Sequence, residues 1–346
     1  MEKQKTETPS GKFNTVAIFS MVFSCCAMVL IGTIALFATE KNQGIDFQND
    51  QKEMARWESL TSMEGVALRA GVLGKSAFVD SAASAMTLQK LFEESNYRID
   101  KVRSRGKVPR IFLATLPQDM RSLRRTENRK VTFIKAILPL ILLANELILE
   151  DRRKIISIRL KKNIQKVIRE SDRLWLANTA KRYDLEKFDF DALLLRVDVI
   201  PPSLAIAQAA EESGWGTSRF AREGNALFGQ RIYTNKKKGL VPAERSAEQK
   251  FRVRVFETLI DGVKAYMHNL NSHFSYTKFR KRRGKIRASY SVINGYELTG
   301  ALKPYSEQGA DYITRVRRIM RGDDLHVFDS SSLDNFITFF KQKSGV

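Results

Sequence analysis

The longest uninterrupted apolar pattern lies near the start of the chain, where residues 13–39 contain no charged side chain. A helix rises about 1.5 Å per residue, so this segment exceeds the roughly 30 Å hydrocarbon core of a bilayer. A cleaved signal peptide is the alternative, but its apolar region spans only about 7–15 residues and ends at a small-x-small cleavage site. We therefore expect a transmembrane anchor. Because Lys3, Lys5 and Lys12 precede it, residues 1–12 are expected in the cytoplasm.

After this segment, apolar residues recur mainly at helical spacing. Residues 40–106 predict a polar tether followed by an irregular helical region. Residues 107–120, KVPRIFLATLPQDM, have two prolines around an apolar run, which favours an extended segment packed against the protein.

A long helix is predicted over residues 128–162, with a kink near Pro139 because proline removes an intrahelical hydrogen bond. A second membrane span is the alternative, but the uncharged run 136–145 is too short to cross a bilayer. The apolar stripe should therefore be buried in protein. With a further helix over residues 163–183, it makes residues 107–195 a helical framework.

The next helix is predicted to begin at Pro201 and Pro202 and to stop at Gly214, because proline fits a first helical turn and glycine a helix end. Ser218 is a suitable N-cap for a following short helix, which should end near Gly224 and Asn225.

From Phe251 to Val255 the apolar period changes to two, which predicts a strand that pairs with residues 228–233 in a β-hairpin. Thr258 and Asp261 resemble a capping box at the start of an amphipathic helix. Residues 310–321 predict the last helix. The rest, residues 326–346, is expected to be a tail.

The composition adds a strong positive charge: 59 Lys and Arg against 38 Asp and Glu give a formal net charge of +21. A charge of this size outside the cytoplasm favours an acidic partner, and anionic envelope polymers are expected. Nucleic acid is not expected, because the basic run 278–287 lacks a recognisable recognition helix and interleaved stacking aromatics. Both cysteines lie within residues 13–39 and the three histidines share no ligand spacing, so we expect no metal and no cofactor.

The candidate chemistry lies at the end of the helix that begins at Pro201. Gln208 and Glu212 lie on one stripe of this helix. A carboxylate at a helix C-terminus faces the negative end of the macrodipole, which favours retention of its proton, and Trp215 could add an apolar wall. Glu211 points about 100° away around the helix and is expected to be a solvated surface carboxylate.

The stretch AQAAEESGWGTSRFAREGNALFGQ resembles the core motif of bacterial endo-β-N-acetylglucosaminidases that cleave peptidoglycan. The surrounding chain, from PRIFLATLPQDM to YSEQGADY, resembles Bax-type glucosaminidases over roughly residues 107–321. The resemblance implies a mainly α fold, with a lysozyme-like α lobe and a small β-hairpin lobe across a sugar-binding cleft. It also implies a catalytic domain at residues 196–325, with Glu212 as the general acid.

Other site residues follow from the same resemblance. A second acid is expected in the β lobe, at Glu244 or Glu248, with Glu248 favoured by spacing; attack by the acetamido group of the substrate is the alternative. Tyr312 is expected to contact the sugar or the transition state. The expected substrate-binding residues are Gln208, Trp215, Asn225, Phe228, Gly229 and Tyr305. The chain departs from the family pattern at Glu211, where an apolar residue is usual, and at Arg231, where relatives often carry Trp.

These expectations combine into a single-pass protein of the inner (cytoplasmic) membrane, with its catalytic domain in the periplasm. The expected substrate is the glycan strand of peptidoglycan, cleaved at the β-1,4 bond after N-acetylglucosamine. A muramidase or a lytic transglycosylase of the same fold is one alternative. A non-catalytic cell-wall-binding scaffold is the other, because Glu211 departs from the family pattern and the second acid is not fixed.

Overall fold

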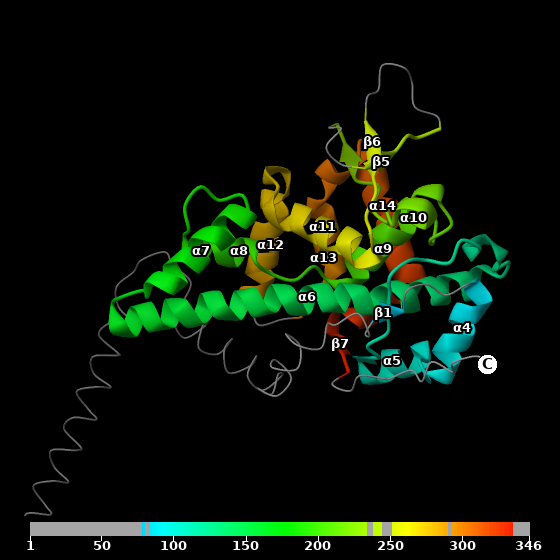
Figure 1. Ribbon diagram of the computed structural model, residues 1–346, viewed down its shortest axis with the longest axis horizontal. Coiled ribbons are helices and arrows are strands. Elements are labelled where there is room, and N and C mark those ends of the chain that lie inside the picture. The colour runs from blue at the N-terminus through cyan, green and yellow to red at the C-terminus, as the bar shows by residue number, and fades with distance from the viewer. Residues whose placement is uncertain (1–77, 80–83, 234–237, 244–250, 290–291, 335–346) are drawn as a thin grey trace, which may run out of the picture. The chain divides into compact units, whose positions relative to one another are not determined.

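The structure of the protein, a computed structural model, describes residues 78–79, 84–233, 238–243, 251–289 and 292–334. These residues all belong to one contact unit, residues 47–346. The expected anchor, residues 13–39, lies outside the described residues. Helices dominate the described part and the sheets are small, so the expected mainly α class is confirmed (Figure 1).

The long helix α6, Thr126–Gln165, forms the axis of this part of the chain. It continues through Pro139 and is the one helix among the described residues that is long and apolar enough to cross a membrane. The most apolar window of α6 has a mean hydropathy of 1.9, and 72% of that window is buried inside the protein. The expectation that this stripe packs in protein is therefore confirmed.

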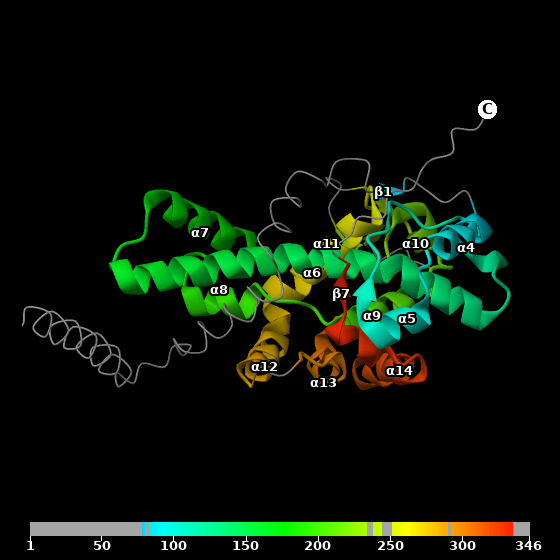
Figure 2. The same ribbon diagram turned by 90° about the horizontal axis from the view of Figure 1, so that it is seen from below.

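Helix α6 extends slightly beyond its predicted end. Lys166, with a left-handed φ of 61°, terminates it, and the next helix begins at Glu170 rather than at residue 163. Both views place α7 and α8 beside one end of α6 and α4 and α5 beside the other (Figures 1 and 2).

The elements on the N-terminal side of α6 are short. The two parallel strand pairs join β1 to β3 and β2 to β7, so the segment that precedes α6 is extended and packed, as predicted. The elements are β1 (Phe78–Val79), α4 (Ala85–Glu94), α5 (Ile99–Arg105), β2 (Lys107–Val108), β3 (Phe112–Leu113) and η2 (Met120–Ser122).

Helix α9, Pro202–Ser213, is the central element of the following region. All residues from Pro202 to Ala210 are buried, because α9 packs against α6, α13, α14 and η6 on different sides. A helix that is buried all round can hold its end rigidly, and this end carries Glu212. The neighbouring helices are α7 (Glu170–Arg182), α8 (Phe190–Arg196) and α10 (Arg219–Gly224), the last capped by Ser218 as predicted.

The only sheet with more than two strands in the described residues is antiparallel, in the order β4-β6-β5. Strand β4 (Arg231–Ile232) pairs with β6 (Arg252–Arg254), which confirms the predicted pairing, but the two strands do not form a hairpin because a third strand lies between them in the sequence. Strand β5 (Gly239–Leu240) lies on the other edge of β6. It was not predicted, because two residues are too few to show a period.

The C-terminal half contributes the remaining helices. Thr258 accepts a hydrogen bond from the Asp261 amide and caps α11, as the sequence predicts. The elements are α11 (Leu259–Ser272), η3 (Phe274–Tyr276), α12 (Thr277–Ala288), α13 (Gly295–Leu298), η4 (Thr299–Ala301), η5 (Lys303–Tyr305), α14 (Gly309–Gly322), η6 (Leu325–Ser330) and β7 (Ser332–Leu333).

The expectation of a tail after the last helix is wrong for the residues up to 334. Phe328 in η6 and Leu333 in β7 are buried in the core. The carboxylate of Asp329 accepts hydrogen bonds from the Ser203 amide at 2.9 Å, the Ser203 hydroxyl at 2.8 Å and the Gly295 amide at 2.9 Å. This segment therefore holds the first turns of α9 and α13.

Candidate active site

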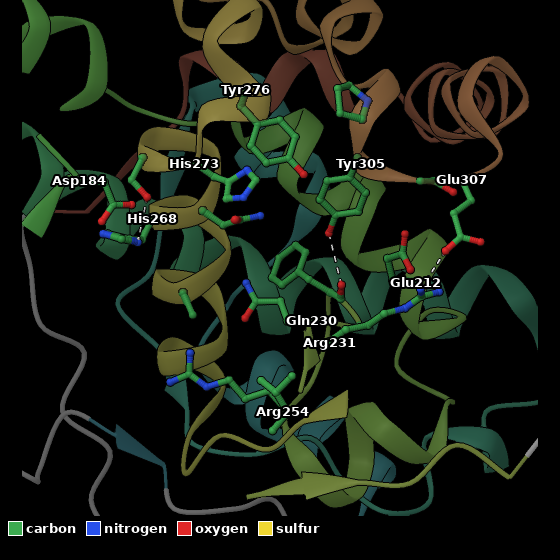
Figure 3. Close-up of a pocket in the computed structure, with 18 of the residues that line it drawn as sticks. Asp184, Glu212, Gln230, Arg231, Arg254, His268, His273, Tyr276, Tyr305 and Glu307 are labelled. Atoms are coloured by element: carbon green, nitrogen blue, oxygen red, sulfur yellow. Dashed lines mark hydrogen bonds and ion pairs between the residues drawn. The ribbon is translucent and has the colours of Figure 1, made fainter. Parts of the chain in front are cut away.

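A cavity of about 730 Å³ opens between the sheet, helix α11 and the segment that precedes α14 (Figure 3). Glu212 lines it at the end of α9. On α11 the lining residues Ala265, His268, Asn269 and Ser272 recur at helical spacing, so one face of that helix forms a wall.

A tight turn places Glu212 at this cavity. Helix α9 ends at Ser213, and the next three residues, Gly214, Trp215 and Gly216, have left-handed φ angles of 57°, 58° and 79°. At Gly216 a Cβ would lie 2.9 Å from the Leu116 side chain, so glycine is required there for both conformation and space. The sequence Ser-Gly-Trp-Gly thus reverses the chain directly after Glu212.

The surroundings of Glu212 raise the pKa of its carboxyl group above the ordinary value. Desolvation by the cavity walls is the largest cause, even though the side chain is exposed to the cavity. A hydrogen bond from Tyr312 and the charges of Arg315 and Arg231 act in the opposite direction, and the charge of Glu211 adds to the rise. Glu212 therefore keeps its proton to a higher pH than an ordinary glutamate does.

Behind Glu212 lies a buried hydrogen-bond chain. The amide nitrogen of Gln208 donates to the Tyr312 hydroxyl at 2.8 Å, and the Tyr266 hydroxyl donates to the Gln208 amide oxygen at 2.7 Å. Burial raises the pKa of both tyrosines, so they remain neutral donors. The chain fixes the orientation of the Tyr312 hydroxyl next to the Glu212 carboxyl.

Aromatic rings continue from this chain to the cavity surface. Tyr305 stacks on Tyr312 with ring centroids 5.4 Å apart, and Phe228 stacks on Tyr266 at 3.8 Å. The Tyr305 hydroxyl donates to the Phe228 carbonyl at 3.3 Å. Phe228 and Tyr305 both line the cavity, which gives the site an apolar wall beside an acid.

Gly229 completes this wall and lies next to Glu212. Its φ is +61°, and a Cβ at this position would lie 3.4 Å from the Glu212 carboxylate oxygen. Glycine therefore allows the left-handed turn and leaves the space in front of the acid open. Of the residues predicted for the site, Glu212, Phe228, Gly229 and Tyr305 line the cavity, and Tyr312 lies directly behind them.

Three residues predicted to bind substrate are placed elsewhere. Gln208 is fully buried in the hydrogen-bond chain. Trp215 packs its ring edge-on against Phe133 of α6 at 5.8 Å, away from the cavity lining. Asn225 caps α10 in a left-handed conformation and donates to the Phe256 and Glu257 carbonyls. Burial of Gln208 and Asn225 corrects the expectation that they form the surface of the site, whereas the half-buried Trp215 lies outside this cavity lining and its contact with substrate stays a prediction.

The expectation for Glu211 is also corrected. Its carboxylate is half-buried and pairs with the Arg315 guanidinium of α14, which also donates to the Gln308 side chain. The two adjacent glutamates at the end of α9 thus have different roles: Glu211 joins α9 to α14, and Glu212 faces the cavity.

Arg231, noted in the sequence as a departure from the family pattern, lines the cavity and bridges to Glu307 with a nitrogen–oxygen distance of 2.8 Å beside Glu212 (Figure 3). Other lining residues were missed from the sequence. His273 and Tyr276 line the cavity at the end of α11, and Asp184 lies next to His268 at the far side. The helical spacing of the α11 residues was visible in the sequence. The sequence does not show, however, that this face of α11 points towards Glu212, because tertiary packing determines that orientation.

Glu244 and Glu248, the two candidates for a second acid, lie outside the described residues. Within the part of the chain that the structure describes, no group of three His, Cys, Asp or Glu side chains is arranged to hold a metal ion. The other described carboxylates that line the cavity are Asp184 and Glu307.

Comparison with known proteins gives three similarities. A family model described as mannosyl-glycoprotein endo-beta-N-acetylglucosaminidase matches residues 189–325. Protein Bax of Escherichia coli strain K12 is 33% identical over 205 residues, which cover 58% of this chain and 71% of Bax. The catalytic domain of the autolysin Auto from Listeria monocytogenes is 19% identical over 46% of this chain and 83% of that domain. The TM-score of this match is 0.29.

Proposed function

Because the chain belongs to the Bax-type glucosaminidase family, we propose that it is a peptidoglycan hydrolase that cleaves the β-1,4 bond after N-acetylglucosamine. The family supports a glycosidase. The choice of peptidoglycan as substrate rests on the motif from Ala207 to Gln230, which resembles that of peptidoglycan-cleaving members.

The observation that carries this proposal is Glu212, a carboxyl group with a raised pKa at the wall of a cavity large enough for sugar rings. A general acid must hold its proton until the glycosidic oxygen takes it, and a raised pKa extends the pH range in which it can do so. We assign this role to Glu212.

The neighbours of Glu212 support the same role. Tyr312 bonds to the carboxyl group and is itself oriented by Gln208. A sugar ring carries both apolar C–H faces and hydroxyl groups, so an aromatic wall of Tyr305 and Phe228 suits it. Because Gly229 has no side chain, the space in front of the Glu212 carboxylate stays free for the glycosidic bond that is cleaved. We propose that these residues hold the sugar against the acid.

Hydrolysis also needs a group on the other face of the sugar. We propose that Glu248 or the acetamido group of the substrate supplies it; the first would come from the segment between β5 and β6. In this proposal the helices from residue 196 to 325 form a lysozyme-like lobe, and β4, β5 and β6 form the smaller β lobe across the cleft.

Purified full-length protein in detergent should release fragments from peptidoglycan whose new reducing ends are N-acetylglucosamine. Mass spectrometry of the products before and after borohydride reduction identifies these ends. New muramic-acid reducing ends would make the protein a muramidase, and anhydro ends would make it a lytic transglycosylase. Binding to sacculi without any product would contradict an enzymatic function and favour the scaffold.

We also propose that residues 13–39 anchor the protein in the inner membrane with residues after 39 in the periplasm. Their uncharged composition supports this proposal. The full chain should remain in the membrane fraction after a wash in 1 M salt, roughly the concentration at which the Debye length falls to about 3 Å. Release by salt alone would show that the basic surface, rather than a span, holds the protein to membranes.

A further inference from the structure

Two arginines enter the cavity from neighbouring strands and point in different directions. Figure 3 shows Arg231 of β4 reaching towards Glu212 and Glu307, whereas Arg254 of β6 extends to the side of α11. Arg231 is paired, because its guanidinium meets the Glu307 carboxylate at 2.8 Å. Arg254 differs: no side-chain hydrogen bond or ion pair joins it to any residue in the described part of the chain.

The conformation of Arg254 is nevertheless fixed. It is half-buried, and its guanidinium carbon lies 4.5 Å from the centroid of the Phe256 ring, an arrangement in which the ring face holds the cation. Its backbone amide donates to the Gln230 carbonyl at 2.8 Å, so the strand beneath it is also held. The guanidinium is thus oriented before any ligand binds, and this pre-organisation lowers the entropic cost of binding.

The wall that faces Arg254 is polar and mostly uncharged. On α11, Ala265 leaves room, Asn269 offers an amide, and the His268 ring is held by the Arg182 carbonyl. The carboxylate of Asp184 lies next to His268 at the far end of the cavity and forms no ion pair with Arg254. A half-buried guanidinium that pairs with no carboxylate among the described residues favours a planar carboxylate ligand, which it can bind through two parallel hydrogen bonds.

We propose that Arg254 forms a subsite for a carboxylate on the muramic-acid arm of the substrate. This inference rests on the proposed function and deepens it. The sugar rings of the glycan are neutral, but muramic acid carries a lactyl arm that ends in a carboxylate or in an acidic peptide. A subsite on the α11 side of the cavity would therefore recognise what distinguishes a peptidoglycan strand from a neutral polymer of N-acetylglucosamine.

The test uses three forms of the same glycan and the full-length protein. The first form carries the acidic peptides; the second is treated with an amidase, which leaves the lactyl carboxylate; in the third that carboxylate is converted to a neutral carboxamide. We expect Arg254→Gln to lower kcat/KM about tenfold on a carboxylate-bearing form, as for loss of a charged hydrogen-bond pair. On the neutral form it should match the wild type. A lower kcat/KM on the first form identifies a peptide carboxylate as the ligand of Arg254, and a lower kcat/KM on the second form identifies the lactyl carboxylate.

Two further variants keep the result interpretable. Arg318→Gln removes the same charge from an exposed position of α14 outside the cavity and should leave all three rates unchanged. Arg254→Lys keeps the positive charge but lacks the planar guanidinium that binds a carboxylate through two hydrogen bonds. This variant should lose part of the preference for the carboxylate-bearing forms over the neutral form, and it serves as the test if Arg254→Gln does not fold. Equal effects of Arg254→Gln on all three forms, or no effect, would overturn the subsite. A wild-type protein that cuts none of them would contradict the proposed function itself.

Discussion

Replacement of Asp198 by alanine is expected to lower the free energy of unfolding by about 3–5 kcal/mol, the range for removing one partner of a buried ion pair. Asp198 lies between α8 and α9 and is 2% exposed. Its carboxylate pairs with Arg287, and the Arg152 and Arg283 guanidinium nitrogens each approach it to 3.8 Å. Without Asp198, three cations would share a site from which water is largely excluded.

The cluster around Asp198 also joins separate elements. Arg283 of α12 is fully buried and donates to the Asp198 carbonyl at 3.1 Å and to the Asn271 side chain of α11 at 2.6 Å. Asn271 in turn donates to the Asp198 carbonyl at 2.9 Å. Alanine keeps this backbone carbonyl, but it leaves the charges of Arg283, Arg152 and Arg287 without their carboxylate, and the repulsion among them should loosen the packing of α8 on α6 and α12.

The pH dependence gives a second readout for Asp198. Burial raises the pKa of its carboxyl group, but the charges of Arg287, Arg152 and Arg283 outweigh this and hold the pKa well below the usual range. The stabilising contribution is therefore complete above the unfolded-state pKa of about 3.9 and is lost as the pH falls further towards the folded-state value.

Urea unfolding of wild type and Asp198→Ala between pH 3 and pH 7 tests this prediction. The difference between the two proteins should be largest near pH 7 and should shrink below about pH 4, where the unfolded carboxyl group becomes protonated. Asp100→Ala is the matched control, because Asp100 pairs with Arg98 on the surface and both side chains are 61% exposed. Equal destabilisation by the two substitutions would mean that the buried cluster has no special role.

The local elements around Glu212 could be predicted because their signals lie within a few residues of each other. Pro201 and Pro202 start a helix, Gly214 ends it, and the alternation around Val253 gives a strand. Each of these signals fixes backbone angles or a buried face directly. The end of a helix with a carboxylate in its last turn was therefore found without tertiary information.

The directions of the neighbouring side chains could not be predicted in the same way. Trp215 follows the helix end and was expected to line the cavity, but its left-handed φ of 58° and the ring of Phe133 direct it towards α6. Gln208 shares a stripe with Glu212, yet two tyrosines from α11 and α14 enclose it. These contacts involve residues more than 50 positions apart, which spacing along one helix does not reveal.

Substitution of Glu212 by glutamine is expected to lower the hydrolysis rate by about 10²–10⁴-fold, the usual contribution of a general acid. Glutamine keeps the size of the side chain and an acceptor for the Tyr312 hydroxyl, but it has no acidic proton to donate. Because Glu212 is exposed to the cavity, the melting temperature should change little. A large loss of rate in a protein that still melts normally and binds sacculi would locate the effect in the chemical step.

Glu211→Gln is the matched control for this experiment, since it makes the same change one residue earlier, outside the cavity lining. It should reduce the rate far less, but it should change the pH profile. The charge of Glu211 raises the pKa of Glu212, whereas that of Arg315 lowers it, so removal of Glu211 leaves Arg315 uncompensated and lowers the pKa of Glu212. A general acid is active while protonated, and the alkaline limb of the profile should therefore move to lower pH.

Turnover of purified peptidoglycan across a pH series measures both effects. Equal losses in the two variants would show that the end of α9 matters only for structure, and an active Glu212→Gln protein would exclude Glu212 as the acid.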